Sequence, residues 1–152
     1  MADILSLVDT MTKPNFTQIQ LVMMQNGASA SDYGKLKLML EKKFNLPSLS
    51  SDNVLHLAIM MENPNFTQLQ LILLENGSPP SDYGELRVIM EKKFNLPLIE
   101  GDVEELLKLS ETIEKPNFTQ FQLAFMENSA PADAYFKLRK VMESRFQLTL
   151  CV

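Results

Sequence analysis

The chain has 152 residues, 45% of them hydrophobic and 22% charged, and its formal net charge is −5. This composition predicts a folded protein with its own core and excludes an intrinsically disordered chain. The acidic balance argues against nucleic-acid binding, which usually needs a basic surface. The absence of an apolar run of about 18 residues excludes a membrane-spanning helix, so no membrane contact is expected.

The N-terminus lacks the basic and apolar regions of a secretory signal peptide. The only cysteine, Cys151, has no second cysteine with which to form a disulfide within the chain. These features predict an intracellular, cytoplasmic protein.

The string Pro-Asn-Phe-Thr-Gln occurs three times and sets the register of the whole chain. The strings start at Pro14, Pro64 and Pro116, which are 50 and 52 residues apart. Aligning them gives three copies in a single repeat domain, at residues 1–48, 49–98 and 99–152. A period of this length with helical patterning is typical of helical repeat proteins.

The first helix of each copy is predicted from apolar residues at helical spacing. In the first copy it covers Ile4–Met11, and the proline of the string ends it, because the residue before a proline disfavours helix. The corresponding helices are Val54–Met61 and Val103–Ile113.

The second helix is predicted at Phe16–Gln25 and is followed by the helix stop Asn26-Gly27. Asn15 is its expected N-cap, with the Gln18 side chain reaching back in a capping box. Apolar residues occupy most of its circumference, and only Gln18 and Gln25 form a wet edge. We therefore expect it to be the buried central helix of its copy.

One polar residue interrupts the apolar face of this helix. Gln20 lies between Phe16 and Met24 on the helical wheel, and glutamines recur there as Gln70 and Gln122. An unpaired buried amide costs on the order of 1–3 kcal/mol, so these side chains need partners. Each glutamine either bonds a loop backbone and locks neighbouring elements or lines a groove that contacts a partner.

The third helix is predicted from about Ser31 to Phe44, with a tyrosine at the start of its apolar stripe. The three tyrosines are Tyr33, Tyr83 and Tyr135. Gly34 and Gly84 follow two of them, and a glycine in the first turn suggests close approach by the next copy. The third copy has Phe136 there, which we expect to cap an array that has no further copy.

The predicted fold is therefore all-α, with three tandem three-helix copies of about 50 residues. Each copy is too small to cover its apolar second helix alone, so the copies must stack. The similar spacers between copies favour a short solenoid. The alternative is a closed bundle with pseudo-threefold symmetry.

The sequence contains no motif for catalysis, cofactors or metals. Phosphate loops, nucleophile elbows and cysteine or histidine spacings typical of metal sites are absent, and His56 is the only histidine. We predict that the protein is not an enzyme and uses no cofactor.

The predicted function is that of a non-catalytic binding or scaffold protein that engages a protein partner through a groove between stacked copies. The candidate contacts are Gln20, Gln70, Gln122, Tyr33, Tyr83 and Tyr135. The acidic segment Glu100 to Glu114 favours a basic partner.

Two alternatives remain open. A nucleic-acid-binding helical repeat would require the basic residues of the third helices to form one continuous stripe. These residues are Lys35, Lys37, Lys42, Lys43, Lys92, Lys93, Arg139 and Arg145. A purely structural or designed repeat without a ligand would also explain the close similarity of the first two copies.

Overall fold

The computed structural model describes residues 2–12, 14–49 and 53–148, and these residues form nine α-helices without a strand. Cys151 lies outside the described residues. The helices are α1 (Ala2–Thr10), α2 (Phe16–Gln25), α3 (Ala30–Lys43), α4 (Val54–Met60), α5 (Phe66–Glu75), α6 (Pro80–Phe94), α7 (Val103–Thr112), α8 (Phe118–Glu127) and α9 (Ala132–Phe146). The all-α prediction is confirmed, and the predicted helix bounds differ from these by at most two residues.

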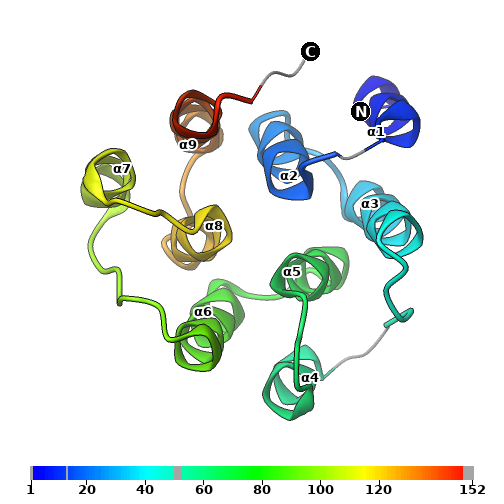
Figure 1. Ribbon diagram of the computed structural model, residues 1–152, viewed down its shortest axis with the longest axis horizontal. Coiled ribbons are helices and arrows are strands. Elements are labelled where there is room, and N and C mark those ends of the chain that lie inside the picture. The colour runs from blue at the N-terminus through cyan, green and yellow to red at the C-terminus, as the bar shows by residue number, and fades with distance from the viewer. Residues whose placement is uncertain (1, 13, 50–52, 149–152) are drawn as a thin grey trace.

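The helices form a ring with the second helix of each copy innermost (Figure 1). α2, α5 and α8 surround a common axis, where Thr119 Oγ1 lies 3.1 Å from Thr17 Oγ1 and 3.5 Å from Thr67 Oγ1. α3 packs along α5, α6 along α8, and α9 along α2. α1, α4 and α7 lie at the periphery (Figure 1).

The packing of α9 on α2 closes the ring, so the arrangement is the closed bundle and not the open solenoid favoured by the sequence. Polar contacts join the two helices: Gln18 Nε2 donates to Glu143 Oε2 at 2.8 Å, and Arg139 Nε donates to Gln25 Oε1 at 3.2 Å. The third copy therefore meets the first through side chains as well as through apolar packing.

Closure also corrects two predictions about Gln18. This residue is buried rather than part of a wet edge, because α9 covers it. Asn15 Oδ1 accepts the backbone N–H of Gln18 at 2.9 Å, as expected of an N-cap, but the Gln18 side chain reaches Glu143 instead of turning back. Only half of the predicted capping box forms.

The ends of the inner helices follow the predicted signals. Gly27 and Gly77 come directly after the C-caps of α2 and α5 with φ angles of 68° and 65°, in the left-handed region that favours glycine. After α8, Ser129 takes the same conformation with φ 53°. A serine there lacks the conformational freedom that makes glycine suitable.

Gly34 and Gly84 are buried, and a Cβ on either would meet a glutamate of the next copy, Glu75 or Glu127. The predicted close approach is confirmed. The role expected for Phe136 is wrong, because the third copy does have a neighbour. Phe136 is half-buried, and the Arg139 guanidinium lies 5.3 Å from its ring centre.

Candidate functional site

The three glutamines predicted as partner contacts are fully buried. Each belongs to an inner helix, and two of them reach across to the next inner helix. Gln70 Nε2 donates to Met126 Sδ at 2.9 Å, and Gln122 Nε2 donates to Met24 Sδ at 3.1 Å. These amides therefore form a polar layer between helices, out of reach of a partner.

Gln20 differs from the other two because of a single substitution in the neighbouring copy. The position that corresponds to Met24 and Met126 is Leu74, which offers no acceptor. Neither amide atom of Gln20 has a hydrogen-bond partner among the described residues. The asymmetry of this layer thus follows from leucine replacing methionine.

In the second and third copies, the expected bonds to loop backbone are made by the glutamine that ends the string. Gln68 Nε2 donates to the Pro47 carbonyl at 2.8 Å, and Gln120 Nε2 donates to the Pro97 carbonyl at 2.7 Å. These side chains lock the linker that leaves one copy onto the inner helix of the next. The locking role was correctly anticipated but assigned to the wrong glutamine.

The three tyrosines are also core residues. Burial, with a smaller contribution from the nearby Asp32 carboxylate, raises the pKa of Tyr33 to about 12. Burial likewise raises the pKa of Tyr83 and Tyr135. The tyrosines therefore stabilise the copies from within, and the predicted groove of glutamines and tyrosines is not a surface of this protein.

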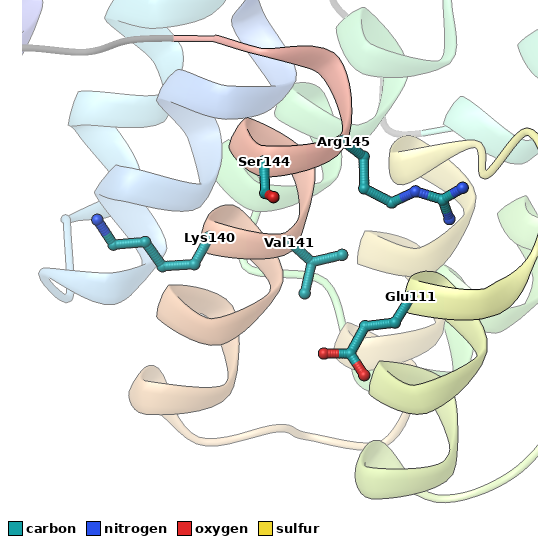
Figure 2. A pocket seen from close by; sticks show the side chains of 5 residues that line it. All are labelled: Glu111, Lys140, Val141, Ser144 and Arg145. Atoms are coloured by element: carbon teal, nitrogen blue, oxygen red, sulfur yellow. The ribbon is translucent and has the colours of Figure 1, made fainter.

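A different groove lies between the peripheral helix and the third helix of a copy. In the third copy it has a volume of about 450 Å³ and is lined by Glu111 of α7 and by Lys140, Val141, Ser144 and Arg145 of α9. Figure 2 shows Val141 and Glu111 in the space between the helices, with Arg145 directed toward the end of α7. Arg145 donates there to the carbonyls of Ser110 and Ile113.

The same positions carry different side chains in the other two copies. They are Asp9, Leu38, Met39, Lys42 and Lys43 in the first copy, and Ile59, Val88, Ile89, Lys92 and Lys93 in the second. Lys93 Nζ donates to the Met61 carbonyl, so the end of α4 meets α6 in the second copy as α7 meets α9 in the third. This contact between helix ends is repeated, but the side chains beside it differ.

The second copy exposes large apolar side chains on α4 and α6. Ile59, Met60 and Val88 have exposed fractions of 57%, 68% and 46%, and together we call them the apolar surface. The first and third copies place Asp9-Thr10 and Glu111-Thr112 at the two α4 positions. An exposed apolar cluster is unusual on a protein surface without a partner.

The sequence also contains a signal for this surface. Aligning the copies shows apolar residues at positions 59 and 60 where the other copies are polar. Searching for residues common to all copies favoured the core, because the core is what the copies share. Ile59 and Met60 of the apolar surface lie instead where one copy departs from the others.

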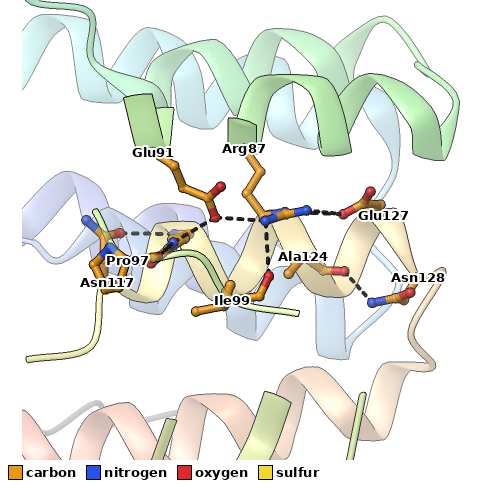
Figure 3. A network of polar contacts seen from close by, with 9 residues as sticks. Arg87, Glu91, Pro97, Ile99, Asn117, Ala124, Glu127 and Asn128 are labelled. Carbon is orange, nitrogen blue, oxygen red and sulfur yellow. Dashed lines mark hydrogen bonds and ion pairs between the residues drawn. The ribbon is translucent and has the colours of Figure 1, made fainter. Parts of the chain in front are cut away.

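A cluster of polar groups joins α6 to α8 (Figure 3). Arg87 Nη1 donates to Glu91 Oε2 at 2.8 Å, and Arg87 also pairs with Glu127 at 3.2 Å. Gln120 Nε2 donates to the same Glu91 oxygen at 2.8 Å. The corresponding triplets at the other joints are Lys37–Glu41–Gln68 and Arg139–Glu143–Gln18. Repetition at every joint indicates a structural role.

The basic residues of the third helices do not form one free stripe. Lys37 and Arg139 are buried beside glutamates of their own helices. Lys43, Lys93 and Arg145 donate to backbone carbonyls at the ends of the peripheral helices. These five residues are therefore engaged within the protein, whereas Lys35, Lys42 and Lys92 are exposed.

Among the described residues, no group of three or more histidine, cysteine, aspartate or glutamate side chains could hold a metal ion. In the same part of the chain, every helix is too short or too polar to cross a bilayer.

Comparison of the chain with protein-family models, with curated proteins and with solved structures yields no match.

Proposed function

We propose that this chain is a non-catalytic binding protein that engages a protein partner through the apolar surface of its second copy. The observation that carries the proposal is the exposure of Ile59 and Met60 at positions that are polar in both other copies, beside Val88, whose first-copy counterpart Leu38 is exposed as well. Burial of such a cluster against a partner is favourable at about 25 cal/mol per Å² of apolar area.

The packing around this surface suits a binding role. α4 and α6 are held by the ring, and Lys93 ties the end of α4 to α6, so the surface is pre-organised. Pre-organisation lowers the entropic cost of association. Met60 adds an unbranched, adaptable side chain of the kind often found at protein-binding surfaces.

Site-specific cross-linking tests the proposal directly. Photo-reactive benzoylphenylalanine replaces Met60 in one protein and Thr112, its counterpart in the third copy, in the matched control. Each is irradiated in an extract of the source cells, and adducts are identified by mass spectrometry. We expect a defined protein adduct from position 60 and none from position 112.

A second variant separates binding from folding. Ile59→Glu with Val88→Lys introduces the residues that the third copy already has at these exposed positions, so stability should change by less than about 0.5 kcal/mol. The adduct at position 60 should disappear in this background. Identical adducts at both positions, or none at position 60, would overturn the proposal and favour a repeat without a ligand.

A further inference from the structure

The three joints of the ring have the same helix packing but differ in their covalent connection. α3 packs along α5 at the first joint, α6 along α8 at the second, and α9 along α2 at the third, which we call the closing joint. The chain between α3 and α4 links the first copy to the second, and the chain between α6 and α7 links the second copy to the third. No linker joins the third copy to the first, so non-covalent contacts alone hold the closing joint.

The linkers also supply hydrogen bonds to the joints that they cross. At the second joint, Gln120 Nε2 donates to the Pro97 carbonyl at 2.7 Å, and Arg87 Nη1 donates to the Ile99 carbonyl at 3.1 Å. At the first joint, the Pro47 carbonyl accepts the corresponding glutamine bond. Opening either joint therefore breaks bonds to a linker in addition to the contacts between the helices.

A change of one residue weakens the closing joint further. At the second joint, Arg87 Nε donates to Glu127 Oε1 at 3.2 Å. At the closing joint, Arg139 Nε donates to Gln25 Oε1, also at 3.2 Å. The second and third copies have glutamate at this position of the inner helix, as Glu75 and Glu127, and the first copy has glutamine. The closing joint thus keeps the geometry of the ion pair without its negative charge, and a hydrogen bond to a neutral acceptor is weaker than one to a carboxylate.

We propose that the ring opens at the closing joint while the other two joints stay closed, and that Gln25 sets how often it opens. Parts of a fold can open at a lower free energy than the whole. The open form is an arc of three copies in which Gln18 has lost Glu143. Gln122 of α8 has also lost Met24 of α2, so the buried glutamine layer is uncovered at one side. The closed ring is therefore a device that hides this layer, and the neutral residue at position 25 keeps it able to open.

The opening does not depend on the proposed function. The apolar surface on α4 and α6 belongs to the second copy, and both joints of that copy stay closed in the arc. The cross-link at position 60 and the opening of the closing joint are therefore measured independently.

Thiol labelling measures the opening of each joint separately. Leu21 lies one turn from both Gln18 and Gln25 on α2, so it is on the side that α9 covers. Its counterpart on α8 is Leu123, and both leucines are fully buried. Leu21→Cys and Leu123→Cys are each made with Cys151→Ser, so that each protein has a single thiol. A buried thiol reacts with dithionitrobenzoate only while its joint is open, and urea denaturation verifies that both proteins are folded with similar stability.

We expect the cysteine at position 21 to be labelled at least about tenfold faster than the one at position 123, because opening the second joint also breaks the linker bonds and an ion pair. Gln25→Glu should slow labelling at position 21 about threefold and leave position 123 unchanged. The reciprocal change Glu127→Gln should speed labelling at position 123 by a similar factor. The effect of Gln25→Glu should shrink at high salt, because salt screens an ion pair near the surface.

The other outcomes contradict the proposal in different ways. Equal labelling rates at positions 21 and 123 would mean that the ring opens only by global unfolding, and faster labelling at position 123 would place the opening at the second joint. Either result overturns the proposal. If position 21 is labelled faster but Gln25→Glu does not slow it, the role of Gln25 is overturned and the opening at the closing joint stands.

Discussion

At the scale of single residues, the same side chain has different surroundings in each copy because its neighbour differs. Gln70 and Gln122 each donate to a methionine sulfur, while Gln20 faces the position of Leu74 and keeps both amide atoms unpaired. Removing a buried polar group from water without a replacement hydrogen bond is unfavourable by about 1–3 kcal/mol. Of the three buried glutamines, Gln20 is therefore the one that lowers the stability of the fold most.

We expect Gln20→Leu to raise the free energy of unfolding by about 1–3 kcal/mol, because the change removes two unpaired buried atoms at similar side-chain volume. Gln122→Leu is the matched control, and its gain should be smaller because it also breaks the bond to Met24. Urea denaturation followed by circular dichroism measures both. A loss of stability in Gln20→Leu would show that the amide is satisfied in solution, for example by an internal water.

At the scale of elements, helix ends depend on short-range signals that recur in each copy. Asn15, Asn65 and Asn117 all accept the backbone N–H three residues ahead, so each inner helix starts in the same way. The ends are less uniform. Ser129 occupies a left-handed conformation that glycine adopts in the first two copies, and this conformation costs a residue with a side chain roughly 1–2 kcal/mol.

Exchange of these residues should move stability in opposite directions. Ser129→Gly is expected to stabilise the protein by about 1 kcal/mol, and Gly77→Ser to destabilise it by a similar amount. A Cβ on Gly77 would meet no atom within 4 Å, so only the backbone conformation contributes there. Thermal unfolding by calorimetry measures both. Changes of the same sign would contradict this explanation of the helix ends.

At the scale of the whole molecule, ring closure gives Gln18 the surroundings of an interior residue. In an open array this side chain would face solvent at the first edge. In the ring it donates to Glu143 of α9, as Gln68 donates to Glu41 and Gln120 to Glu91. The joint between the last and first copies therefore repeats the glutamine–glutamate bond of the joints within the chain.

We expect Gln18→Ala to destabilise the protein by about 1.5–3 kcal/mol, the usual range for a hydrogen bond to a charged group. Gln120→Ala is the comparison, and its effect should be at least as large because Gln120 also bonds the Pro97 carbonyl. Chemical denaturation measures both under the same conditions. An effect of Gln18→Ala below about 0.5 kcal/mol, the usual range for surface substitutions, would mean that the ring is open in solution.

The helices could be predicted from the sequence because their signals are local. Asn15, Gly27 and the apolar spacing act within one or two turns. Ring closure depends on how each copy packs on the next, as α3 packs on α5, and no local sequence pattern encodes this packing. The helical wheel therefore wrongly placed Gln18 at a solvent-exposed edge. Gln20 and Tyr33, which were among the predicted partner contacts, are buried in the ring. Residues that recur in all three copies identify the shared core. Ile59 differs from its counterparts in the other copies, so recurrence does not identify it.

A closed ring also constrains the gene that encodes it. In an open array, recombination between repeats adds or removes whole units, and the products still fold, since each unit contacts only its neighbours. In this protein the packing of α9 on α2 requires each copy to be rotated from the previous one by a fixed fraction of a full turn. Recombination between the identical strings at Pro14–Gln18 and Pro64–Gln68 would delete one unit and leave an inner helix uncovered. Such deletions should be removed by selection. The closed geometry therefore keeps the number of units constant, although recombination between the repeats can change it.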